Sequence, residues 1–136
     1  MTKTLITSFI FVSIIFLIID VIWLSITVKS LYRPALGDLL NDKPVMWAAA
    51  LFYIIYTVSL AIIILQPAIA NDSIFQAFWT GIIFGVVTYG TYNLTNMATI
   101  KDWSPTIVFV DMFWGGLLTG FSSASGIYLS KILFSN

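Results

Sequence analysis

Four long apolar runs alternate with short polar segments along the chain. The runs cover residues 4–28, 45–66, 74–97 and 106–130. A helix rises about 1.5 Å per residue, so about 20 apolar residues cross the roughly 30 Å hydrocarbon core of a bilayer. The runs are continuous rather than alternating, which indicates helices and not the strands of a barrel. The pattern predicts an all-α membrane protein, a bundle of four transmembrane helices with short loops, in one domain over residues 1–136.

The segments between the runs contain residues that interrupt apolar helices. Charged side chains, Gly and Pro are concentrated there, and Pro44 and Pro105 stand directly before apolar runs, where a missing N–H costs little. The first run follows Lys3, as in a signal peptide. However, the run is longer than the apolar core of a signal peptide, and no A-x-A-like cleavage site follows it. We therefore expect residues 4–28 to be retained as the first span.

Composition supports the membrane assignment and narrows the chemistry. Hydrophobic residues make up 60% of the 136 positions and charged residues 9%, whereas a soluble domain has about 25% charged residues. An ordinary soluble enzyme or DNA-binding domain is therefore excluded. Six basic residues balance six acidic ones, so we expect no nucleic-acid partner. Because the chain has neither His nor Cys, we also expect no metal site and no cofactor.

Basic residues near the span ends indicate an orientation, because cytoplasmic loops of membrane proteins are enriched in Lys and Arg. The first and third loops hold four basic residues and the opposite side holds two: Lys29, Arg33, Lys43 and Lys101 against Lys3 and Lys131. This distribution predicts cytoplasmic first and third loops, with both termini in the periplasm.

Two acidic residues lie inside spans. Asp20 is in the first apolar run and Asp111 in the fourth. A charged side chain in the bilayer core is costly and usually faces a partner, a cavity or a pathway. The alternative is a structural role, because polar side chains also join helices by hydrogen bonds within membranes.

Each of these acids begins an Asp-x-x-Trp motif. Asp20 precedes Trp23, and Asp111 precedes Trp114. A spacing of three places acid and indole on one helix face, and the helical rise places each acid level with the other motif's Trp. An indole N–H can donate a hydrogen bond to a carboxylate. The two motifs run in opposite directions, as in the inverted repeats of transporters, although chance recurrence in a Trp-rich chain would give the same pattern.

Polar residues at the end of the third span extend this pattern. Tyr89, Asn93 and Asn96 follow i, i+4, i+7 spacing and share one face, with Tyr92 beside them. One interpretation is that these residues are polar only because the span ends here and the loop begins. The other is that they form one buried cluster with the two acids. The candidate ligand-binding or proton-coupling residues are Asp20, Asp111, Trp23, Trp114, Asn93, Asn96, Tyr89 and Tyr92.

Small residues mark the surfaces where helices approach closely. Gly81 and Gly85 are four residues apart in the third span, and Gly116 and Gly120 are four apart in the fourth. Such spacing lets helix backbones come together, which predicts close packing rather than a substrate groove.

Three functions remain open on these residues. Two neighbouring carboxyl groups can share a proton, which favours a protein that binds or moves a small apolar or lipid-like molecule with proton coupling. The alternatives are a lipid-modifying enzyme, or a subunit of one, that uses the acids as general acid and base, and a structural or assembly protein without a ligand. We favour a non-enzymatic role. The expected partners are membrane lipids, and a homodimer is an alternative to a monomer because one such bundle is small for enclosing a pathway.

A set of motifs over nearly the whole chain resembles a known family. The motifs are Asp20-x-x-Trp23-Leu24, Lys29-x-Leu31-Tyr32-Arg33-x-x-Leu36-Gly37, Tyr92-x-Leu94-Thr95-Asn96-x-Ala98-Thr99 with Trp103, and Asp111-x-x-Trp114-Gly115. The chain is similar to domain-of-unknown-function family 2177, small bacterial four-span proteins of the inner membrane. The resemblance implies a multi-pass bacterial protein and supplies no catalytic residue. Asn93 stands where many members carry Asp, so a mechanism that needs a third carboxylate has no support in this chain.

Overall fold

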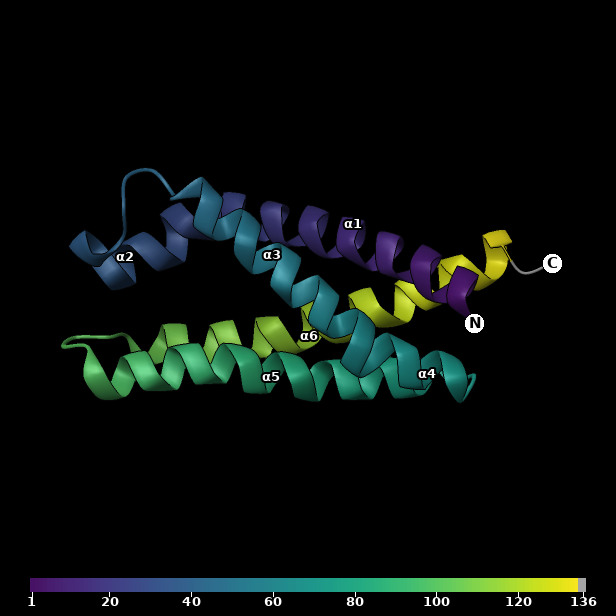
Figure 1. Ribbon diagram of the computed structural model, residues 1–136. Helices are drawn as coiled ribbons and strands as arrows, with labels where there is room; N and C mark the ends of the chain where they lie inside the picture. The colour runs from purple at the N-terminus through teal and green to yellow at the C-terminus, as the bar shows by residue number, and fades with distance from the viewer. Residues whose placement is uncertain (135–136) are drawn as a thin grey trace.

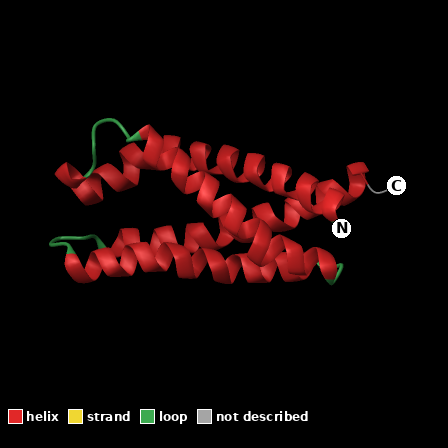
Figure 2. Cartoon of the chain, viewed as in Figure 1, coloured by secondary structure: helices red, strands yellow, loops and turns green. Residues whose placement is uncertain are grey.

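The computed structural model describes residues 1–134, and within them all regular structure is helical (Figure 2). Its elements are α1 (Thr2–Thr27), a π-helical turn (Val28–Tyr32), α2 (Arg33–Leu36), a 3₁₀ turn (Gly37–Leu39), α3 (Met46–Leu60), a second π-helical turn (Ala61–Leu65), α4 (Gln66–Ala70), α5 (Ile74–Thr99) and α6 (Pro105–Phe134). They join into four helical stretches, each long and apolar enough to cross a membrane. The predicted all-α fold with four membrane spans is confirmed.

The helices form two pairs that meet near the chain termini. α5 and α6 run side by side along one edge of the molecule, and α1 and α3 form the opposite edge (Figure 1). α3 crosses from beside α1 toward α5, where α4 ends. The start of α1 lies beside the end of α6, since the Ser130 hydroxyl donates to the carbonyl oxygen of Thr4 at 3.3 Å. Away from the termini the two pairs diverge (Figure 1).

The first helical stretch continues beyond the predicted span. It extends from Thr2 to Leu39, whereas the apolar run ends at Val28. Hydropathy sets where a helix leaves the hydrocarbon, but Arg, Ala and Leu remain good helix formers after that point. The α-helical part ends at Gly37, which has a φ of 55°. Glycine adopts this left-handed conformation without the steric cost that other residues incur.

Each π-helical turn ends two residues before a proline. In the first, the N–H of Arg33 bonds to the carbonyl of Val28, and Pro34 follows. In the second, the N–H of Gln66 bonds to the carbonyl of Ala61, and Pro67 follows. A proline in a regular helix lacks an N–H and clashes with the carbonyl four residues earlier. The wider turn lets each helix continue past its proline, so α4 includes residue 67, which the sequence pattern places in a connection.

Glycines bring α5 and α6 into backbone contact. A methyl group on Gly85 would collide with the carbonyl oxygen of Gly115, and one on Gly81 would lie 2.9 Å from the Cα of Gly120. A methyl group on Gly120 would lie 2.7 Å from the carbonyl oxygen of Phe78. Gly116 and Gly120 therefore face another helix, as their spacing predicts.

α1 packs on the other side of α6 and closes the core. A methyl group on Gly126 would lie 3.0 Å from the backbone nitrogen of Val12, so these two helices also approach closely. Phe16 and Leu60 are fully buried beside this contact. Large apolar side chains elsewhere point outward, including Ile6, Ile55 and Phe113. An apolar exterior around a small core is what a lipid environment requires.

Candidate functional site

Asp20 lies where α1 meets α3 and α6. The residue is 6% exposed, and its carboxylate accepts hydrogen bonds from the hydroxyl of Tyr53 and from Nε1 of Trp114, the latter at 3.2 Å. The bond from Trp114 is the pairing that the helical rise predicts between the two Asp-x-x-Trp motifs. A buried acid of this kind needs such donors, because the hydrocarbon around the bundle offers none.

Asp111 lies on α6 and receives two other donors. The hydroxyl of Tyr32 donates to Oδ1 at 2.7 Å, and Nδ2 of Asn93 donates to Oδ2 at 2.6 Å. Asn93 is fully buried on α5, and its Nδ2 also contacts the carbonyl oxygen of Tyr89 at 3.0 Å. Asp111 therefore joins the end of the first helical stretch to the α5–α6 pair.

Hydrogen bonds connect Trp23 to Asp111 through Tyr32, which differs from the predicted direct pairing. Nε1 of Trp23 donates to the Tyr32 hydroxyl at 3.2 Å, and that hydroxyl in turn donates to Asp111. Nine residues of regular α-helix would turn Tyr32 about 180° away from Trp23. The π-helical turn at Val28–Tyr32 takes up one extra residue, which reduces this angle to about 80° and lets the two side chains meet.

The two branches of hydrogen bonds meet at a pair of stacked rings. The indoles of Trp23 and Trp114 have centroids 4.2 Å apart and planes that differ by 8°. Trp114 belongs to the Asp20 branch and Trp23 to the Asp111 branch. Both intramembrane acids therefore belong to one connected group of side chains.

Most members of this group line a cavity of about 440 Å³ between the two helix pairs. Its polar members include both carboxylates and Thr88. Most of the remaining wall is aromatic, and these side chains are Trp23, Tyr32, Phe52, Tyr53, Tyr56, Tyr89 and Tyr92. At the inner end, the Tyr56 hydroxyl bonds with Thr119 at 2.7 Å and with Thr88 at 3.2 Å. The volume falls within the range of ligand-binding pockets, about 300 to 1,000 Å³.

The structure brings most of the predicted site residues together at this cavity. Trp114 and Asn93 are outside the cavity lining and donate hydrogen bonds to the two acids. Tyr89 and Tyr92 line the cavity itself. Asn96 is half-buried near the end of α5 and is not part of the cavity lining. Its spacing from Asn93 is correct for the same face, but the cavity does not extend that far along the helix.

Tyr32 and Tyr53 are site residues that the sequence pattern missed. Tyr32 follows Lys29 and precedes Arg33, so its surroundings indicate a loop. Tyr53 lies in a run that is apolar on all sides, so periodicity does not show which face of α3 is turned inward. A search for hydroxyl donors able to satisfy the two acids would have suggested both residues.

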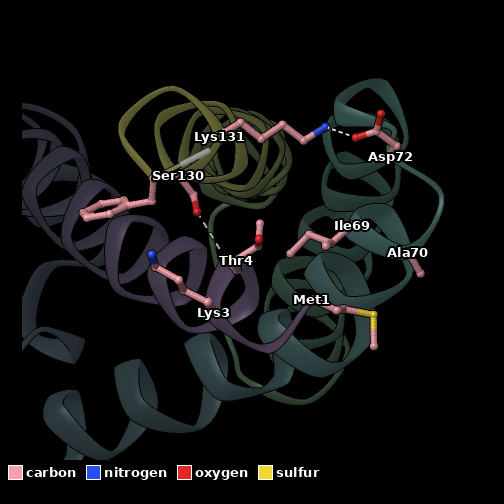
Figure 3. Close-up of a pocket in the computed structure, with 9 residues that line it drawn as sticks. Met1, Lys3, Thr4, Ile69, Ala70, Asp72, Ser130 and Lys131 are labelled. Carbon is pink, nitrogen blue, oxygen red and sulfur yellow. Dashed lines mark hydrogen bonds and ion pairs between the residues drawn. The ribbon is translucent and has the colours of Figure 1, made fainter. Parts of the chain in front are cut away.

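A larger cavity of about 780 Å³ lies at the opposite end of the molecule, beside the termini, and Figure 3 shows its lining. Lys131 reaches across to Asp72, and Ser130 donates to the carbonyl oxygen of Thr4 at 3.3 Å (Figure 3). Lys131 holds the pKa of Asp72 below its usual value through a hydrogen bond and charge attraction. None of the predicted site residues lies there, so size alone does not identify the functional site.

Comparisons with known proteins agree with the membrane assignment. The sequence model of a family described as predicted membrane protein (DUF2177) matches residues 5–128. No curated protein and no solved structure matches the chain.

Proposed function

The chain belongs to this DUF2177 family of predicted membrane proteins, and on that premise we propose that it binds a small apolar or lipid-like molecule in the aromatic cavity, with proton exchange at Asp20 and Asp111. The observation that supports the proposal is the placement of both intramembrane carboxylates at one cavity. A purely structural acid would be enclosed by helix contacts on every side, whereas these two also face a space large enough for a ligand.

The hydrogen bonds around the acids support proton exchange. Asp20 faces Tyr53 and Trp114, and Asp111 faces Tyr32 and Asn93. All four partners are uncharged donors, so neither acid is neutralised by a neighbouring cation. Binding a proton is one way to remove the cost of a charge inside the membrane, and a ligand that alters the surroundings of the acids would alter proton occupancy.

Native mass spectrometry of the protein released from nanodiscs tests the binding proposal. Ala49 lines the cavity, and Ala49→Trp would fill part of it. The wild type should carry a bound small molecule that this variant lacks. Ile55→Trp is the matched control, because Ile55 lies on the same helix and is 58% exposed. Equal adducts on the wild type and both variants would contradict binding in this cavity.

Lipid analysis of a deletion strain tests the alternative of an enzyme. A binding protein should leave the covalent structures of membrane lipids unchanged. A lipid species that disappears on deletion and returns with the wild-type gene, but not with Asp111→Asn, would favour catalysis over binding.

We also propose a bacterial inner-membrane location with periplasmic termini. Arg33 and Lys101 are at the end with the first and third loops, where basic residues are more numerous. A periplasmic reporter fused after residue 136 should be active, and activity of a cytoplasmic reporter at that position would reverse the orientation.

A further inference from the structure

The cavity has two carboxyl groups and no basic side chain beside them. Neither Asp20 nor Asp111 lies within 4.0 Å of a basic side chain in the described part of the chain; the ion pairs there are Arg33–Asp42 and Lys131–Asp72. None of the residues lining the cavity is Lys or Arg. The neutral donors stabilise each carboxylate but do not cancel its charge.

The wall also contains aromatic side chains beside these acids. Trp23 and Tyr32 lie on the Asp111 branch, and Tyr53 donates directly to Asp20. The negative face of an aromatic ring attracts a cation, most strongly where water is excluded, and aromatic cages bind quaternary ammonium groups in this way. Carboxylates and ring faces together are the chemistry that recognises an organic cation.

The outer part of the cavity suits the rest of such a molecule. Leu24 and Phe52 line the cavity and are 38% and 42% exposed, so they lie where the cavity opens outward. Both are apolar and on helices that cross the membrane. A ligand with a cationic head and an apolar body would therefore place its head near the carboxylates and its body against Leu24 and Phe52.

We propose that the cavity binds a lipophilic organic cation, an amphiphile whose ammonium head is held by Asp20, Asp111 and the aromatic wall. This inference rests on the proposed function and specifies its ligand class. The cation supplies the positive charge that the protein itself does not place beside the two acids. A neutral lipid-like molecule would fill the same volume but would give the ionised carboxylates no counter-charge.

Three probes that each contain one benzene ring, and that differ in charge, test the role of charge in binding. They are phenyltrimethylammonium, its neutral isostere tert-butylbenzene, and benzenesulfonate. Binding to the purified full-length protein in nanodiscs is followed by tryptophan fluorescence, because Trp23 lines the cavity. The cation should bind about ten-fold more tightly than the isostere, and the anion should be weakest. Equal affinity for the cation and the isostere would overturn the cation proposal and leave the proposed function standing.

Charge-removing variants locate the effect. Asp20→Asn and Asp111→Asn should each weaken binding of the cation about ten-fold while leaving the isostere nearly unchanged. Asp38→Asn is the control, because Asp38 is an exposed acid in the 3₁₀ turn outside the cavity, and its replacement should not change either affinity. Equal loss of affinity for the cation and the isostere in the cavity variants would show a structural effect and contradict the proposal.

If either variant fails to fold, the affinities of the three probes for the wild type still test the cation proposal. The proposed function itself is judged separately by the adduct lost in Ala49→Trp.

Discussion

Trp23 and Trp114 stack with their ring centroids 4.2 Å apart, and this contact joins the two Asp-x-x-Trp motifs. Each indole donates into a different branch, since Trp114 bonds to Asp20 and Trp23 bonds to Tyr32. The stacked pair therefore holds helices α1 and α6 in register at the depth of the intramembrane acids. Replacing one of the two Trp residues removes this contact and leaves both Asp residues in the sequence.

Trp114→Phe should destabilise the protein by about 1–3 kcal/mol, because it removes one of the two donors to buried Asp20. Thermal unfolding would measure this change, and near-ultraviolet circular dichroism should lose the signal of two coupled indoles. Trp47→Phe is the control, because Trp47 is 72% exposed and should alter neither measurement. An unchanged unfolding temperature for Trp114→Phe would contradict the importance of this donor.

Gly85→Ala should reduce stability by about 1–3 kcal/mol, because the added methyl group meets the rigid backbone of Gly115. Gly90→Ala provides a comparison on the same helix. Its methyl group would meet the end of the Met112 side chain, which is flexible and can move aside. We expect a clear difference between their unfolding temperatures in detergent, and equal values would argue against backbone contact as the basis of the α5–α6 pair.

Asn93→Asp should make stability strongly dependent on pH. The amide nitrogen of Asn93 lies 2.6 Å from Oδ2 of Asp111, so the variant would place two carboxyl groups in contact. At low pH the pair can share a proton, but at high pH both would carry charge in a buried site. The unfolding temperature should therefore fall as pH rises. Asn96→Asp, which lies outside the cavity, should show a much weaker pH dependence.

Asp72 should titrate below its usual pKa of 3.8 because of Lys131. Since the folded pKa is depressed, the stabilisation from this ion pair is present above the unfolded value and is lost as pH falls through the folded value. Carbon NMR of the Asp72 carboxyl group would report the midpoint. Lys131→Gln should move the midpoint up toward 3.8, and an identical midpoint in that variant would exclude the ion pair in solution.

The sequence predicts those parts of the site that follow from regular helical geometry. The bond from Trp114 to Asp20 follows from the rise per residue. The contact between Gly116 and α5 follows from four-residue spacing. Both predictions need only the position of a residue along a regular helix and the direction in which that helix runs.

The remaining contacts depend on departures from that regularity. Tyr32 reaches Trp23 and Asp111 only because a π-helical turn changes the helix rotation, and hydrophobic periodicity carries no signal for one extra residue. Tyr53 depends on which face of α3 turns inward, and a membrane helix that is apolar all round does not reveal that face. The cavity itself arises from the divergence of two helix pairs, which is a property of the assembled bundle.

During synthesis, α5 and α6 leave the ribosome after α1 and α3. A methyl group on Gly81, Gly85, Gly116 or Gly120 would meet its nearest atoms within this helical hairpin. The hairpin can therefore close within the bilayer without α1 and α3, as helices do when they insert first and associate afterwards. A gene divided within the loop at residues 71–73 should then give two polypeptides that assemble in the same membrane.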